Sequence, residues 1–174
     1  SNQTNAESTY GAMSFESDGF SFTNDPQQSH NTNGDNYVAW GWKAGDSNVS
    51  NTDGSITSTV RANTTYGFSI VSYTGTGTNP TTIGHGLSSA PKMMIVKNRD
   101  QADNWAVYHE SIGASNHLEL NTTSASISAA QVWAATAPTT SVFSTGTNHK
   151  TNASGEDYIA YCWAEKAGYS KFGS

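Results

Sequence analysis

Residues 97–105 combine charged and amide side chains with an indole ring. Of all segments of the chain, this one has the residue types best suited to binding a polar ligand. Its four candidate glycan contacts are Arg99, Asp103, Asn104 and Trp105. The first three can hydrogen-bond to sugar hydroxyls, and an exposed indole can stack on the apolar face of a sugar ring. Because binding residues collect in loops, the sequence predicts a glycan contact here. The alternative is structural, with Trp105 starting a strand and packing in the core above an Asp/Asn-rich turn.

Two pairs of acidic residues, Asp100 with Asp103 and Glu156 with Asp157, have the residue types needed for glycoside hydrolysis. That reaction requires two carboxyl groups that face one bond at a set separation. Both pairs lie beside turn-forming residues, and neither is flanked by a recognisable catalytic frame. We interpret them as solvated turn acids rather than as the acid and base of a depolymerase.

His85 lies between two glycines in the segment Ile83-Gly84-His85-Gly86-Leu87. No other histidine, cysteine or acid stands at metal-ligand spacing from it, so we interpret it as a histidine in a turn. The chain also contains no phosphate-binding loop and no nucleophile elbow. We therefore expect no catalytic residue, no cofactor and no metal, and a protein that is not an enzyme.

The elements that must position these side chains are predicted to be short β-strands. Ser, Thr, Asn and Gly, which are abundant in the chain, favour turns and strand surfaces over helices. Only residues 125–135 contain enough alanine for a helix, and the pattern there indicates a loop or a single helical turn. The predicted strands are residues 19–23, 36–43, 56–62, 67–74, 92–97, 105–109, 117–121, 141–145 and 157–165. The fold class predicted from them is an all-β, antiparallel β-sandwich.

A block of sequence occurs twice, first at residues 35–45 and again, with Tyr, Ala and Trp at matching positions, at residues 156–168. Such a copy indicates tandem units of one structure. The match predicts that residues 1–45 are the C-terminal half of a preceding β unit and that 46–55 are a linker. Residues 56–166 would then be a complete unit, and 167–174 the first strand of a following one. The strands at 19–23 and 36–43 would need partner strands, supplied either by sequence missing from this chain or by another chain. From the second alternative we expect an oligomer or a filament.

Composition and charge limit the partners of the chain. Charged residues make up 13% and the net charge is −6, with no cluster of Lys or Arg, so no nucleic acid partner is expected. No apolar run approaches the length of a transmembrane helix, so no membrane insertion is expected. The single cysteine, Cys162, lies in an apolar string, which predicts a small buried hydrophobic residue and excludes an internal disulfide.

Five strings, in this order, resemble a known family. They are GFSIVSYTGTG at 67–77, IGHGL at 83–87, APKMMIVKNRD at 90–100, WAVYH at 105–109 and YIAYCWAE at 158–165. Together they are similar to a repeated domain of large structural proteins of marine bacteriophages, notably tail fibres of phages that infect cyanobacteria. The resemblance implies a concanavalin-like or jelly-roll-like β-sandwich in tandem units along a fibre, and it supplies no catalytic residues.

The expected function is therefore that of a non-enzymatic virion structural protein, a segment of a tail fibre or appendage that contacts the host surface. Its expected partners are copies of itself, neighbouring virion proteins and a host surface glycan. The alternative is a carbohydrate-binding, lectin-like module of a bacterial surface protein or a secreted protein.

Overall fold

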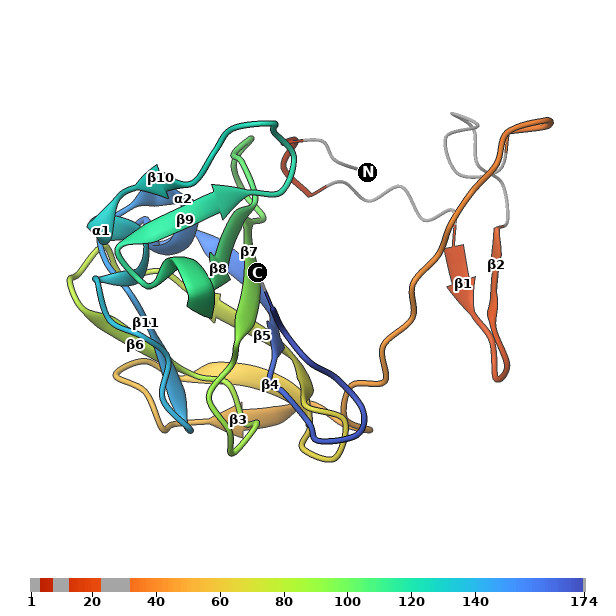
Figure 1. The fold of residues 1–174 in the computed structure, drawn as a ribbon, viewed down its shortest axis with the longest axis horizontal. Coiled ribbons are helices and arrows are strands. Elements are labelled where there is room, and N and C mark those ends of the chain that lie inside the picture. The colour runs from red at the N-terminus through yellow and green to blue at the C-terminus, as the bar shows by residue number, and fades with distance from the viewer. Residues whose placement is uncertain (1–3, 8–12, 23–31, 174) are drawn as a thin grey trace. The chain divides into compact units, whose positions relative to one another are not determined.

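The computed structural model describes residues 4–7, 13–22 and 32–173. By its internal contacts the chain divides into two units. One comprises Ser8–Trp42, and the other comprises Ser1–Glu7 together with Lys43–Ser174. Figure 1 shows the elements of each unit.

The unit of residues 8–42 contains one antiparallel hairpin. Its strands are β1 (Met13–Phe15) and β2 (Phe20–Phe22), which pair so that Met13 lies opposite Phe22. The rings of Phe20 and Phe22 meet edge to face with their centroids 5.5 Å apart. The strand predicted at residues 19–23 is therefore present over Phe20–Phe22, and the position of Thr23 lies outside the described residues.

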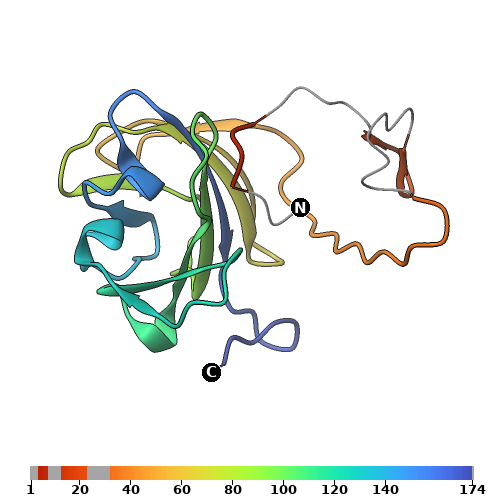
Figure 2. The same cartoon turned by 90° about the horizontal axis from the view of Figure 1, so that it is seen from above.

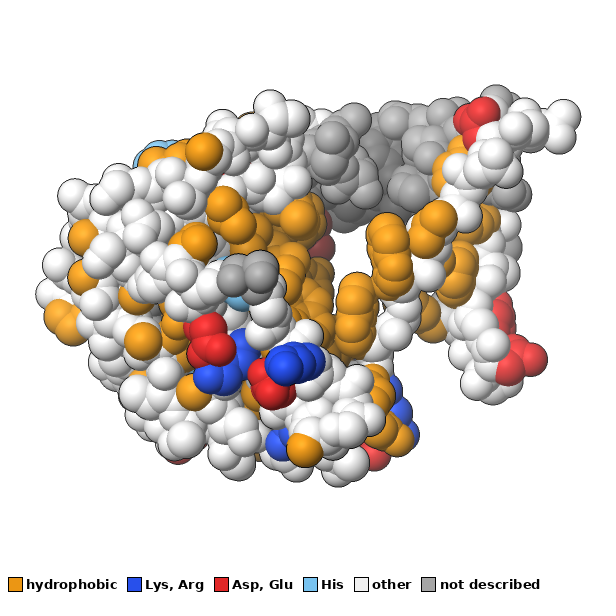
Figure 3. Space-filling model, viewed as in Figure 1, with side chains coloured by type: hydrophobic (Ala, Val, Ile, Leu, Met, Phe, Trp, Pro, Cys, Tyr) orange, Lys and Arg blue, Asp and Glu red, His pale blue; other side chains and the backbone are white. Residues whose placement is uncertain are grey.

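The strand predicted at residues 36–43 is wrong, because this segment forms no strand in the structure. Its apolar side chains are exposed: Tyr37 by 49%, Val38 by 72%, Trp40 by 75% and Trp42 by 50%. Hydrophobic side chains can be seen along it in Figure 3. A strand forms only when a neighbour bonds to its backbone, and no described strand of the chain pairs with this segment. The alternating pattern predicted the strand without indicating what would pair with it.

The larger unit is built on one antiparallel sheet of eight strands in the order β10-β9-β8-β7-β12-β5-β4-β3. The sheet curves around the remaining elements (Figures 1 and 2). Its strands are β3 (Val49–Asn51), β4 (Ser58–Asn63), β5 (Phe68–Thr74), β7 (Met93–Asn98), β8 (Ala106–His109), β9 (Asn116–Glu119), β10 (Ile127–Ser128) and β12 (Asp157–Trp163).

A smaller second layer covers the concave side of this sheet (Figure 2). It contains the antiparallel pair β6 (Thr81–Gly84) and β11 (Val142–Thr145) and the four-residue helices α1 (Ala130–Trp133) and α2 (His149–Asn152). A 3₁₀ turn, η1 (Glu110–Ile112), follows β8. The core fills the space between the layers and includes residues of both, so the predicted antiparallel β-sandwich is confirmed.

Strand β12 lies in the middle of the sheet, with β5 on one side and β7 on the other. Ala160 is opposite both Val71 and Val96, and all three are fully buried. Because successive residues of a strand point to opposite faces, Tyr158, Ala160 and Cys162 face the core, and the residues between them face outward. On the outward face of β12, Ile159, Tyr161 and Trp163 are half-buried and Asp157 is exposed.

The seven strands predicted for the complete unit all have counterparts, with ends that agree to within two residues. Strands β3, β6 and β10 were not predicted, because they are short and rich in Ser, Thr and Asn. The segment 125–135, predicted as a loop or a single helical turn, contains β10 and the one-turn helix α1.

Two segments predicted to connect units have defined structure. Strand β3 lies within the predicted linker, residues 46–55, and pairs with β4 so that Val49 faces Val60. Gly54 packs so tightly that a Cβ atom there would lie 2.2 Å from the carbonyl oxygen of Thr82. Residues 167–173 form no strand, and Ser170 N–H donates to the carbonyl of Lys166 at 2.9 Å to close a turn. The tandem units stay a prediction.

Candidate functional site

All four predicted glycan contacts lie in the loop between β7 and β8, with Arg99 at its start and the other three at its end. Asp103 is only 8% exposed, and its Oδ2 pairs with Nδ1 of His149, whose side chain is largely exposed. The other oxygen, Oδ1, accepts a hydrogen bond from the backbone N–H of Asn104 at 2.9 Å. Both carboxylate oxygens of Asp103 are therefore already bonded to protein groups.

Trp105 is half-buried, so it is neither the fully exposed ring of the glycan-contact interpretation nor the core residue of the structural one. Its backbone N–H donates to Asn121 Oδ1 at 2.9 Å, and Asn121 Nδ2 donates to Asn104 Oδ1 at 2.8 Å. These bonds attach the start of β8 to the residues that follow β9. The role of Asn104 and Trp105 as glycan contacts stays a prediction.

Arg99, the fourth candidate, has a separate set of partners. Its Nε donates to Glu7 Oε2 at 2.6 Å, its Nη2 lies 2.5 Å from the same oxygen, and the N–H of Glu7 donates to the carbonyl of Arg99 at 2.7 Å. Both side chains are more than a third exposed, so this ion pair contributes little to stability. It does hold the guanidinium beside the outer face of the sheet.

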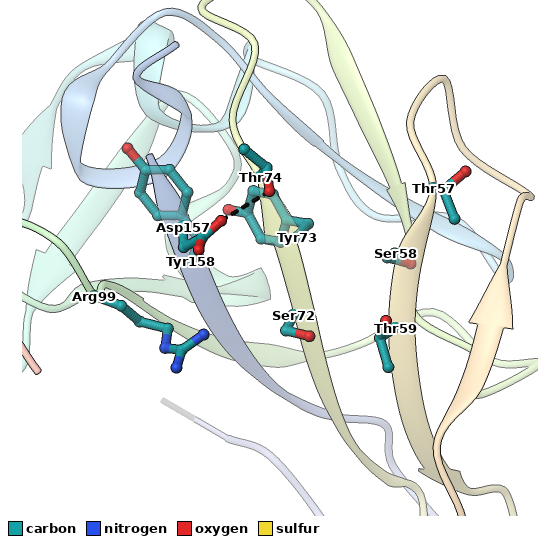
Figure 4. A pocket seen from close by; sticks show the side chains of 9 residues that line it. All are labelled: Thr57, Ser58, Thr59, Ser72, Tyr73, Thr74, Arg99, Asp157 and Tyr158. Carbon is teal, nitrogen blue, oxygen red and sulfur yellow. Dashed lines mark hydrogen bonds between the residues drawn. The ribbon is translucent and has the colours of Figure 1, made fainter. Parts of the chain in front are cut away.

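A hollow opens at that outer face, where β4, β5 and β12 lie beside the residues that follow β7 (Figure 4). Its volume is about 220 Å³. The polar side chains that line it are Thr57, Thr59, Ser72, Thr74, Arg99 and Asp157, together with the buried Ser58. On the core side it is closed by Tyr73 and Tyr158, whose rings stack with centroids 5.2 Å apart. The structure thus places Arg99 among hydroxyl groups that the sequence did not single out.

A buried polar network holds the loops around the hollow. The fully buried Asn98 donates from Nδ2 to Glu156 Oε2 at 2.5 Å and to the carbonyl of His149 at 3.2 Å. Its Oδ1 accepts from the N–H groups of Asp100 and Gln101 at 3.0 and 3.1 Å. One amide therefore joins the end of β7 to the segment around α2, in agreement with the rule that buried polar groups are hydrogen-bonded.

Asn152 forms a second such centre and is also fully buried. Its Nδ2 donates to the carbonyls of Gly146 and Thr78 at 2.7 and 2.8 Å, and its Oδ1 accepts from the N–H of Thr76 at 2.8 Å. The side chain thus bonds to three backbone groups from two separate loops. It ties α2 to the loop between β5 and β6.

The acidic residues considered for glycoside hydrolysis have structural partners. Asp100 Oδ2 accepts from the N–H of Asp157 at 2.6 Å, and Asp157 Oδ1 accepts from Thr74 Oγ1 at 2.8 Å. Asp103 pairs with His149 and Glu156 with Asn98, as described above. Within the described ranges no three His, Cys, Asp or Glu side chains are grouped so that they could hold a metal ion.

Two histidines are buried in the larger unit. His85 accepts from the N–H of Leu87 at its Nδ1 and faces the carbonyl of Thr139 with its Nε2, both at 3.2 Å. The neutral Nε2–H tautomer satisfies both contacts, and burial lowers the pKa of His85. Burial, together with nearby Lys150, also lowers the pKa of His117, which is 2% exposed. His85 directly follows β6 and precedes Gly86, whose φ is +70°, and its interpretation as a turn histidine stays a prediction.

The free energy of unfolding is expected to fall as the pH drops below about 6.5. The unfolded chain then binds protons at His85 and His117 before the folded chain does, so stability is fully present above that pH and is lost below it. Each histidine contributes a slope of at most about 1.4 kcal/mol per pH unit. Urea unfolding at several pH values measures the slope, which His117→Leu should reduce and His109→Gln, at a more exposed position, should not. Equal stability at pH 7.5 and 5.5 would contradict the expectation.

The protein is an all-β sandwich, because a curved antiparallel sheet packs against a small second layer. A polar hollow lies on the outer face of the sheet. The chain belongs to the family described as a domain of unknown function, DUF7483, which matches residues 1–174. The match runs through the predicted linker, residues 46–55, without a break. No curated protein matches the chain, and no solved structure matches it. Among the described residues no helix is long and apolar enough to cross a membrane.

Proposed function

We propose that this chain is a non-enzymatic structural segment of a bacteriophage tail fibre or appendage, built from tandem β-sandwich units and carried on the virion. The observation that supports this most directly is the exposed segment of residues 36–43. It is a copy of the central strand β12, yet no described strand pairs with it. Its sequence fits the inside of a sheet that this chain alone does not complete.

The comparison with β12 indicates what the segment needs. Strand β12 pairs along its whole length with β5 on one edge and over six residues with β7 on the other. Tyr37 and Ala39 stand where β12 has the buried Tyr158 and Ala160. A segment with these side chains buries them only when strands similar to β5 and β7 flank it. The proposal allows three sources of such strands: sequence of the same protein outside residues 1–174, another copy of the chain, or a neighbouring virion protein.

The chemistry of the larger unit is in keeping with a structural role. Its acidic side chains at Asp103, Glu156 and Asp157 are engaged in bonds that hold loops and strands together. Short, uncharged polar side chains suit a spacer exposed to water, and the resemblance to repeated domains of phage fibres points the same way. Contact with the host surface is part of the proposal.

Electron microscopy of phage particles tests this proposal. Virions of a phage that encodes the chain, labelled with an antibody raised against residues 43–174, should carry label on a fibre or another appendage. An antibody against the major capsid protein is the positive control, and particles of an unrelated phage are the negative control. Intact particles that bind no label, while the infected cell contains the protein, would refute the virion role.

The alternative, a carbohydrate-binding module of a bacterial surface or secreted protein, is favoured by one feature, the hydroxyl-lined hollow. A virion fibre and a module of this kind differ in where the protein is found, so the same antibody applied to uninfected bacteria distinguishes them.

A further inference from the structure

We propose that the hollow on the outer face of β4, β5 and β12 binds a neutral carbohydrate through the sugar hydroxyls. The proposal concerns ligand binding by the single chain and goes beyond a structural role in a virion. It also moves the binding site: of the four residues that the sequence indicated, only Arg99 lines the hollow (Figure 4).

The first argument is the set of unused hydroxyl groups. Thr57, Thr59 and Ser72 line the hollow, and across the described residues their hydroxyls make no hydrogen bond to the protein. Thr59 and Ser72 are directly opposite each other on β4 and β5 and point to the same face. Side chains paired in this way have Cβ atoms about 5 Å apart, so a single sugar ring can reach both. Each hydroxyl can donate one hydrogen bond and accept others, as sugar hydroxyls do.

The second argument is the charged pair at one end of the hollow. Asp157 uses Oδ1 to accept from Thr74, and no described group bonds to its other carboxylate oxygen. Arg99 uses Nε and Nη2 for Glu7, which leaves Nη1 for a ligand. A carboxylate acceptor beside a guanidinium donor gives the stronger, directional bonds that orient a hydroxylated ligand.

These groups also exclude other ligand classes. The two negative charges of Glu7 and Asp157 outweigh the single positive charge of Arg99, so a phosphate or carboxylate ligand would find no excess of positive charge. An apolar ligand would need an apolar wall, whereas hydroxyls and charges line this one. A peptide strand would need a free backbone edge, and β4, β5 and β12 are paired on both edges.

The groups are held rigidly before any ligand arrives. Ser72 and Asp157 lie on paired strands in the middle of the sheet, and the N–H of Asp157 is bonded to Asp100. The aromatic rings at the hollow, Tyr73 and Tyr158, are buried at 4% and 0% exposure and offer no stacking surface. Affinity must come from hydrogen bonds without aromatic stacking, so we expect dissociation constants of about 1 mM per site. Several copies in one array would bind a polysaccharide much more tightly.

The test is an NMR titration of the isotope-labelled full chain with maltotriose, cellotriose, chitotriose and galactan fragments, followed by a bacterial glycan array. At least one sugar should shift the signals of Thr57, Thr59, Ser72 and Asp157. Thr59→Tyr fills the hollow from an exposed strand position and should weaken that binding about tenfold or more. Ser72→Ala removes one hydroxyl without adding bulk and should weaken it a few-fold. Ser128→Tyr, on an exposed serine of the edge strand β10, is the matched control and should leave binding unchanged.

Trp105→Ala decides between the hollow and the loop between β7 and β8. The proposal expects this variant to bind like the original chain. It is overturned if Trp105→Ala abolishes binding while Thr59→Tyr and Ser72→Ala retain it, or if none of the sugars binds. Neither result bears on where the chain is found, and a virion without antibody label would leave the binding result intact, so the two proposals fail separately.

Discussion

Replacing Asn152 with aspartate is expected to lower the free energy of unfolding of the larger unit by about 3 kcal/mol or more. The side chain keeps its size, but the group that donates to the carbonyls of Gly146 and Thr78 becomes a second acceptor. A carboxylate would then lie fully buried against two carbonyl oxygens, and among the described residues no Lys, Arg or His side chain bonds to this position. Urea denaturation of the folded chain measures the loss.

Asn148→Asp makes the same chemical change where it should cost nothing. Asn148 is the N-cap of α2, and its Oδ1 accepts from the N–H of Lys150 at 3.0 Å, which a carboxylate oxygen does equally well. The deficit of Asn152→Asp relative to the original chain should also shrink at acid pH, because burial raises the pKa of the new carboxyl group and protonation restores a donor. Equal stabilities of the two variants would show that Asn152 does not hold these loops together.

Replacing Val38 and Trp40 together with serine is expected to reduce self-association of the chain about tenfold or more, which is the usual effect of removing a tryptophan from the centre of an interface. These side chains are 72% and 75% exposed in the single chain, so the change should not alter the unfolding of the larger unit. Exposed apolar segments of this kind mark interaction sites. Analytical ultracentrifugation over a range of concentrations measures the association.

Tyr169→Ser supplies the matched control, since Tyr169 is 59% exposed but lies outside the copied segment that corresponds to β12. The control should associate like the original chain. A monodisperse species of 18.5 kDa at every concentration for the original chain would contradict the expectation that the segment of residues 36–43 takes strands from another copy. A partner of different sequence, or sequence of the same protein outside residues 1–174, would then have to supply them.

The β-sandwich could be predicted because most of its strands show an alternation of apolar and polar residues in the sequence. In β5 and β12, buried residues alternate with more exposed ones, and turn-forming residues mark the strand ends. The same rule gave a wrong result at residues 36–43, where the pattern of a central strand is present and the neighbours are not. Periodicity describes the faces of a strand, whereas a sheet also needs hydrogen bonds at its edges. Strands β3 and β6 were not predicted for the opposite reason. Their sequences show little alternation of apolar and polar residues, and they are strands because they pair with β4 and β11.

The hollow could not be predicted, although every residue in it can be read from the sequence. Threonine and serine occur throughout the chain, so nothing marks Thr59 or Ser72 until the register of β4, β5 and β12 places them side by side. Asn98 and Asn152 are likewise two among many asparagines. Polar residues that end a buried strand, as Asn98 does, are the one signal that could have drawn attention to the network. The sequence instead indicates Trp105, because an aromatic residue among charged ones is unusual in a chain rich in small polar residues.

The buried thiol of Cys162 has a practical consequence. It faces the core at 0% exposure, and burial raises its pKa to about 12, so the reactive thiolate is scarcely present at neutral pH. Since this is the one cysteine of the chain, a maleimide should not react with the native protein and should attach only to a cysteine introduced on the surface. Fluorophores, spin labels or gold particles can thus be placed at chosen positions without first removing a native residue.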